Sequence, residues 1–154
     1  MKIKALAFGA MALALAACGD GGQNPAELRG AAFIANGDGT DITLSFDANE
    51  MRFYGQVVNL YNGDYTAAGN HIKFDQGATT LMMGPANEMA TERDYFQFLT
   101  KVNKYDLNNG TLTLIANDGQ TMTFKQVDAN AVPDDTVTVT ETEAVVVDTP
   151  VVAE

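Results

Sequence analysis

The chain has 154 residues and a formal net charge of −11, because 20 acidic residues outnumber nine basic ones. This balance disfavours nucleic acid and anionic lipid as electrostatic partners, since both repel negative charge. With one cysteine and one histidine, the chain also lacks the ligands for a zinc site of the usual kind.

Residues 1–17 have the composition of a secretory signal peptide. Lys2 and Lys4 provide a basic beginning, and the apolar stretch "ALAFGAMALALAA" follows without a charge. As a helix, that stretch would span only ~20 Å, which is short of the ~30 Å hydrocarbon core of a bilayer. The alternative, a buried core helix, would need a polar face that these residues lack.

The predicted signal peptide ends at the single cysteine of the chain, Cys18. The stretch "LAAC" at residues 15–18 resembles the bacterial lipobox, whose cysteine is acylated and becomes the new N-terminus. The alternative is an unpaired thiol in an oxidising compartment. We therefore predict that Cys18 carries palmitate and related acyl chains. Gly19, in place of an aspartate directly after the cysteine, favours the outer membrane, facing the periplasm, over the inner membrane.

Two segments flank a predicted domain at residues 28–126. Residues 18–27 are predicted to form a flexible tether between lipid and domain. Residues 127–154 contain seven acidic residues but no basic and no aromatic residue, a composition that favours disorder. The alternation in "TVTVT", residues 136–140, leaves open that part of this tail pairs as a strand.

The stretch "NGDGTD", residues 36–41, invites comparison with a calcium-binding loop. In an EF-hand loop that begins at Asn36, the glycine of the sixth position is replaced by Asp41, and the glutamate of the twelfth by Asp47. We therefore interpret the stretch as a solvated turn and predict no metal site.

The next residues alternate between apolar and polar, as expected for β-strands. Ile42, Leu44 and Phe46 have a period of two, and "DANE" then turns the chain toward "MRFYGQVV". The stretches "NGDY" (62–65) and "AAGN" (67–70) predict further turns before a strand at "HIKF".

One segment, "PANEMATERDYFQFLTKV", has helical periodicity and begins at Pro85. Glu88 and Glu92 lie toward its N-terminal end, where the helix dipole favours acidic groups. Its predicted apolar stripe consists of Met89, Tyr95, Phe96, Leu99 and Val102.

After the helix, "TLTLIA", "NDG" and "QTMTF" predict a hairpin, because Asp118-Gly119 suits a turn with positive φ. The expected fold class is α+β: a curved, mainly antiparallel sheet with one inserted helix.

The side chains of this domain do not suggest an enzyme or a cofactor site. A Ser-His-acid triad would need Ser45 and His71, the single serine and histidine, but Ser45 lies within a predicted regular strand. A glycosidase-like pair of carboxylates stays open, although nothing selects two of the many acids.

Two motifs in this order resemble the META domain, the module of HslJ-like heat-shock lipoproteins. The stretch "GQVVNLYNGDYT" matches N-x-x-x-G-x-Y, and "TTLMMGPANEMATERDYFQFL" matches T-x-M-x-x-P followed by M-x-x-E-x-x-Y-x-x-x-L. The resemblance covers nearly all of residues 28–126 and implies a lipoprotein linked to stress tolerance. The matching residues include Asn59, Gly63, Tyr65, Thr80, Met82, Pro85 and Glu92.

The roles that we expect for these residues are structural. Asn59 tolerates left-handed backbone and can bond neighbouring backbone, Gly63 permits a turn, and Tyr65 lies on the strand that follows. Glu92 is expected to help the helix begin. The resemblance also implies a disulfide that this chain lacks, since many members have cysteines where Val58 and Gly84 stand here.

The expected function is that of a lipid-anchored, non-catalytic envelope protein. Its sheet or acidic tail would contact another envelope component. The alternative is a small-ligand-binding module that uses the concave face of the sheet near Tyr54, Tyr61 and Tyr65.

Overall fold

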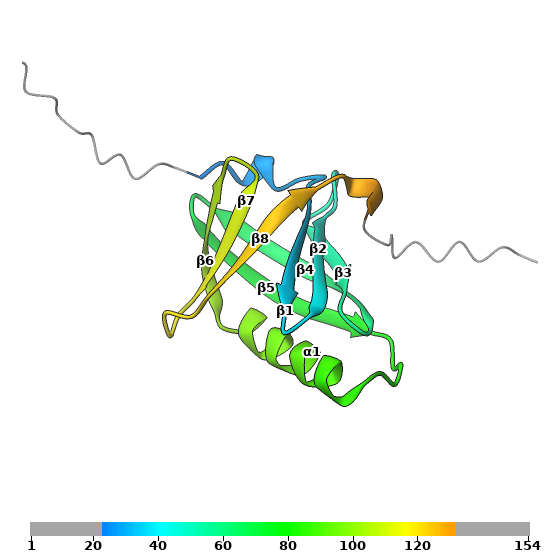
Figure 1. Ribbon diagram of the computed structural model, residues 1–154. Coiled ribbons are helices and arrows are strands. Elements are labelled where there is room, and N and C mark those ends of the chain that lie inside the picture. The colour runs from blue at the N-terminus through cyan, green and yellow to red at the C-terminus, as the bar shows by residue number, and fades with distance from the viewer. Residues whose placement is uncertain (1–22, 132–154) are drawn as a thin grey trace, which may run out of the picture.

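The computed structural model describes residues 23–131, which form an eight-stranded antiparallel barrel (Figure 1). Each strand pairs with its neighbours in the chain, and the first strand closes the barrel by pairing with the last. The strands are β1 (Ala32–Gly37), β2 (Thr40–Phe46), β3 (Arg52–Gln56), β4 (Leu60–Ala68), β5 (His71–Thr79), β6 (Val102–Asn108), β7 (Thr111–Ala116) and β8 (Thr121–Val127).

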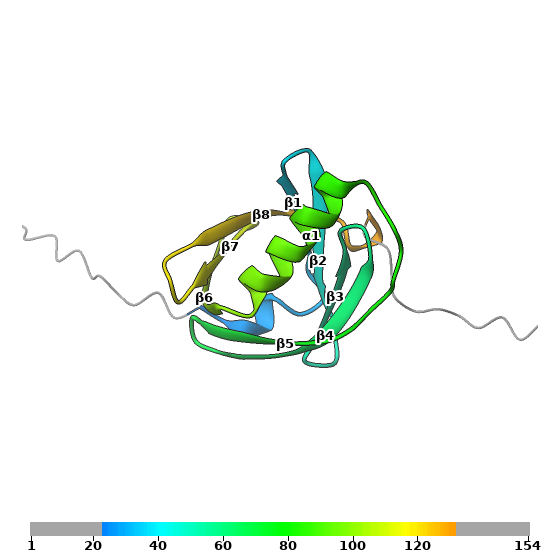
Figure 2. The same ribbon diagram turned by 90° about the horizontal axis from the view of Figure 1, so that it is seen from below.

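One α-helix, α1 (Ala86–Leu99), connects β5 to β6 and lies across one end of the barrel (Figure 2). Its side chains at Tyr95, Phe98 and Leu99 are buried beneath it. Two 3-10 turns, η1 (Pro25–Glu27) and η2 (Ala129–Ala131), lie at the opposite end (Figure 1). Within residues 23–131, no helix has the length and apolar character needed to span a bilayer.

Aromatic rings fill the interior of the barrel. The rings of Phe46 and Tyr65 pack edge to face at 5.0 Å, and those of Phe53 and Phe74 do so at 4.9 Å. Such pairs add to the stability that burial of their large apolar surface provides. The concave face of the sheet is therefore a packed core, and Tyr61 and Tyr65 are part of that core rather than of an open site.

Several local predictions are confirmed, including the mainly antiparallel sheet with one helix. In the turn between β2 and β3, the Asp47 carboxylate accepts hydrogen bonds from the backbone N–H of Glu50 and Asn49, which lower its pKa. The predicted final hairpin is β7–β8, and Gly119 in its turn has a φ of 86°. The stretch at residues 36–41 closes the β1–β2 hairpin, and its turn consists of Asp38 and Gly39.

Two predictions are wrong. Residues 62–65 lie within β4 instead of forming a turn. The helix ends at Leu99, so Val102 belongs to β6. Gln23, within the predicted tether, contacts the barrel: its side chain accepts a hydrogen bond from the backbone N–H of Leu107 and donates one to the Asp106 carboxylate, each at 2.9 Å. The signal peptide, Cys18 and most of the acidic tail lie outside the described residues.

Candidate functional site

The Glu92 side chain is a buried carboxylate at the middle of α1, with 6% of the residue exposed. It faces the loop between β3 and β4. Its Oε2 accepts hydrogen bonds from the backbone N–H of Val58 at 3.0 Å and of Asn59 at 2.6 Å. Its Oε1 accepts a third bond, from Asn59 Nδ2 at 2.8 Å. Three N–H donors thus compensate for taking this carboxylate out of water.

Asn59 extends this arrangement to the segment that follows β5. Its Oδ1 accepts hydrogen bonds from the Thr80 hydroxyl at 3.0 Å and from the backbone N–H of Met82 at 2.5 Å. The Thr80 hydroxyl in turn accepts one from the backbone N–H of Leu60 at 3.1 Å. We name Asn59, Thr80, Glu92 and the Met82 backbone the polar clamp. The clamp joins the β3–β4 loop, the β5–α1 loop and the helix.

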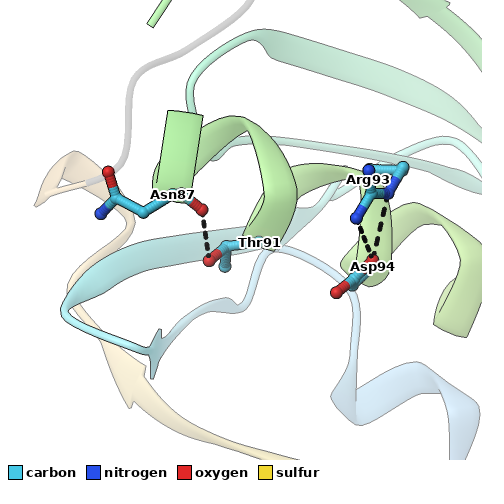
Figure 3. Close-up of polar contacts among 4 residues, drawn as sticks. All are labelled: Asn87, Thr91, Arg93 and Asp94. Carbon is cyan, nitrogen blue, oxygen red and sulfur yellow. Dashed lines mark hydrogen bonds and ion pairs between the residues drawn. The ribbon is translucent and has the colours of Figure 1, made fainter. Parts of the chain in front are cut away.

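Other polar side chains of α1 make local contacts, within the helix (Figure 3). The Thr91 hydroxyl donates to the Asn87 carbonyl at 3.1 Å. The guanidinium of Arg93 contacts the adjacent Asp94 carboxylate at 3.2 Å, and both side chains are mostly exposed. Such exposed pairs contribute little to stability. On this helix, Glu92 is the acidic residue that ties α1 to distant parts of the chain.

The clamp corrects two roles expected from the sequence. Glu92 does not help the helix begin, because it lies a turn and a half beyond the first helical residue, Ala86. Asn59 does not have left-handed backbone, but its side chain does bond backbone, at the N–H of Met82. Pro85 does stand at the start of α1, as predicted.

Gly63 allows two strands to approach closely instead of forming a turn. The β4–β5 ladder shifts register between Tyr61 and Gly63. A Cβ atom at Gly63 would lie 2.2 Å from the Asp75 carbonyl oxygen and 2.7 Å from the Phe53 ring. Tyr65, two residues on, points into the core, and its hydroxyl has no hydrogen-bond partner among the described residues.

A second buried polar contact lies next to the clamp and was not predicted. The Tyr61 and Tyr95 hydroxyl oxygens are 2.8 Å apart. The Tyr61 hydroxyl donates to the Thr43 carbonyl, so that of Tyr95 must donate to Tyr61. Burial raises the pKa of both hydroxyls, which keeps them neutral. Sequence reasoning offered Tyr61 as a ligand contact and placed Tyr95 on the apolar stripe of the helix, but no local pattern relates the two hydroxyls.

The two positions at which the family resemblance implies a disulfide lie side by side. A Cβ atom built at Gly84 would be 3.6 Å from the Cβ of Val58. Disulfides join Cβ atoms about 3.5–4.5 Å apart. The same Cβ would lie 2.7 Å from Val58 Cγ1, so a side chain at Gly84 is accommodated only if Val58 is also changed.

The double variant Val58→Cys, Gly84→Cys is therefore expected to form a disulfide on air oxidation. The bridge should raise the free energy of unfolding by about 2–4 kcal/mol over the reduced form of the same protein. Urea unfolding with and without reductant measures the difference, and thiol titration reports the bridge. The single variant Gly84→Cys serves as a control and should be less stable than the natural chain. Thiols that stay free would contradict the geometry.

Comparison with known proteins identifies the family of this chain and finds solved structures with a similar fold. Residues 22–129 match the family model of the META domain. An NMR structure of a protein from Burkholderia xenovorans is similar, with 18% identity over 82% of this chain and 95% of that one and a TM-score of 0.55. A second NMR structure has 19% identity over 67% of this chain and 94% of that one, with a TM-score of 0.53. No curated protein matches the chain significantly.

Proposed function

Since the chain belongs to the META domain family, we propose that it is a non-catalytic protein of the bacterial envelope, anchored by lipid at Cys18. The polar clamp is the observation that supports a non-catalytic role. The polar side-chain atoms of Asn59, Thr80 and Glu92 are bonded to one another and to backbone, which leaves none poised toward a substrate. The domain would contact another envelope component and contribute to stress tolerance.

The alternative of a ligand site on the concave face has less support. Tyr61 and Tyr65 are 1% and 2% exposed inside the barrel, where aromatic rings occupy the space that a ligand would need. Ligand pockets are hollow and mostly preformed, unlike this interior. A pull-down from solubilised membranes, with the lipidated protein as bait and the Cys18→Ser protein as comparison, would identify the envelope component.

The anchor is tested by replacing Cys18 with serine. The variant is expected to lose labelling by radioactive palmitate and either to leave the membrane fraction or to remain as the precursor, because a hydroxyl does not replace the acylated thiol. The control Gly19→Asp should keep the label and move from the outer to the inner membrane. Labelling of the Cys18→Ser protein would contradict the lipid anchor.

A further inference from the structure

Strand β5 has one edge that lacks a strand partner over most of its length. It pairs with β4 from one end to the other, but its pairing with β6 consists of the single pair His71↔Lys104, and no other strand in the described part of the chain continues the ladder there. Beside that pair, the Asn70 carbonyl accepts a hydrogen bond from the backbone N–H of Tyr105 at 2.9 Å. Since alternate residues of a strand direct their backbone groups to the same side, the N–H and C=O of Phe74 point out of this edge. Such groups are a template for an added strand.

Open space lies beside this edge. A cavity of about 430 Å³ separates the start of β5 from β6, near Ile72 and Val102. A second cavity, of about 570 Å³, lies between Gln76 on β5 and Phe96 on α1. The helix therefore does not close the edge, and another strand can approach it.

The outer face of β5 has two opposite charges that lack an ionic partner. Lys73 and Asp75 are exposed, and the ion pairs among the described residues include neither of them. In the β4–β5 ladder, Asp75 lies directly opposite another acid, Asp64, an arrangement that destabilises a sheet. Arg52 lies 4.0 Å from the Asp64 carboxylate and compensates for that charge. A cation for Asp75 must come from elsewhere.

A second copy of β5, antiparallel to the first, supplies this cation in one register. When the two Phe74 residues lie opposite each other, Lys73 of each copy faces Asp75 of the other on the same outer face. Shifting the centre by two residues toward either end puts Lys73 opposite His71 or Thr79 and leaves Asp75 without a cation. Charge complementarity therefore selects the register centred on Phe74.

The same pairing brings an exposed apolar segment to an apolar cavity. Leu81 and Met83, just beyond the end of β5, are 95% and 97% exposed, and clustered exposed apolar side chains mark interaction sites. Ala67, Ala68 and Ile72 line the smaller cavity, at the start of β5. An antiparallel pair places the end of each β5 beside the start of the other, so the exposed segment of each copy meets the cavity of the other. A symmetric dimer requires a surface that is complementary to itself in this way.

We propose that two copies of this protein form a symmetric dimer by pairing their β5 strands edge to edge. The backbone groups of the two Phe74 residues exchange hydrogen bonds at the two-fold axis. On either side of the axis, Lys73 of one copy pairs with Asp75 of the other. Leu81 of each copy packs at the cavity near Ala67 of the other.

Disulfide cross-linking in cells tests the register. Full-length chains with Lys73→Cys and full-length chains with Asp75→Cys are made together, and copper phenanthroline is added as the oxidant. In the proposed pair, position 73 of one copy and position 75 of the other have Cβ atoms about 4.5–5.5 Å apart, whereas identical positions lie about 7–8 Å apart. Because disulfides need Cβ atoms close together, the mixture should yield at least about fivefold more linked dimer than either variant alone.

The natural chain is the control for Cys18, its one cysteine, and should give no linked dimer. Equal linkage in the mixture and in either variant alone would overturn the proposed register. A mixture that gives no linked dimer would overturn the dimer itself.

Charge reversal provides the second arm, measured by sedimentation of the full-length chain purified as the cell makes it. Lys73→Asp and Asp75→Lys should each weaken the dimer at least about tenfold, since each variant places like charges opposite one another twice. An equal mixture of the two variants should dimerise like the natural chain, because both cross-strand pairs then join a lysine and an aspartate. This recovery also shows that the variants fold.

Lys125→Asp is the matched control, because it makes the same charge change at an exposed position on β8. It should dimerise like the natural chain. A natural chain that sediments as a monomer, or a mixture of the two reversed variants that stays monomeric, would overturn the proposal.

Discussion

Replacing Glu92 with glutamine is expected to lower the free energy of unfolding by about 3 kcal/mol, since hydrogen bonds to charged groups contribute about 1.5–3 kcal/mol each. The carboxylate accepts three N–H bonds, two on one oxygen and one on the other. A glutamine must turn its NH₂ group toward at least one of these donors, whichever way the amide is oriented. Urea unfolding followed by circular dichroism measures the change.

Glu88→Gln is the matched control for this variant. Glu88 lies in the first turn of the same helix and is half-buried rather than buried like Glu92, so its replacement should alter stability by no more than about 0.5 kcal/mol. Comparing the stabilities of Glu92→Gln and Glu88→Gln also shows whether Glu92 has a structural role or is instead available for catalysis or binding. A Glu92→Gln protein that keeps its stability would contradict the polar clamp and reopen a functional role for this carboxylate.

A double-mutant cycle tests whether the clamp acts as a unit. Asn59→Ala and Glu92→Ala remove opposite sides of the same side-chain hydrogen bond, from Asn59 Nδ2 to Glu92 Oε1, so their effects on stability should differ from additive by about 0.5–3 kcal/mol. The exposed pair Arg93 and Asp94 on the outer face of α1 is the comparison, and its coupling should be small. Strictly additive effects of Asn59 and Glu92 would mean that the contacts do not hold the helix in place.

Replacing Gly55 with alanine is expected to prevent folding or to cost more than about 3 kcal/mol, the upper range for overpacked sites. Its new Cβ would lie 2.0 Å from the Thr43 carbonyl oxygen and 2.6 Å from the Tyr61 hydroxyl. The Tyr61 ring can reach Thr43 only because no side chain stands between them. The yield of soluble protein and the melting temperature report the effect.

Gly37→Ala is the control, because the nearest atoms there are the ends of the Thr91 and Ile42 side chains, at 3.2 and 3.3 Å, which can move. The combination of Gly55→Ala with Tyr61→Phe removes the hydroxyl but leaves the clash with Thr43, so we expect at most partial rescue. Natural stability in Gly55→Ala would show that β2 and β3 are not as close here as the structure has them.

Two local features were predicted correctly from the sequence. The final hairpin follows from Asp118-Gly119, and Pro85 begins the helix, since both depend on backbone preferences within a few residues. The antiparallel class likewise follows from the period-two pattern of strands such as β2. The family resemblance selected the residues of the clamp but gave no account of how they contact one another.

The roles of Glu92, Gly55 and Gly63 depend on contacts between residues that are distant in the sequence. Glu92 and the backbone of Asn59 are 33 positions apart, and local pattern could only relate the acid to the helix dipole. Gly63 was expected in a turn and Gly55 within a strand, but the constraint on each comes from a backbone oxygen of a neighbouring strand. The sequence by itself determined the turn after β2, the turn of the final hairpin, the strand period and the start of the helix. Closure of the barrel and assembly of the polar clamp required the tertiary structure, because both depend on which atoms meet once remote strands pack.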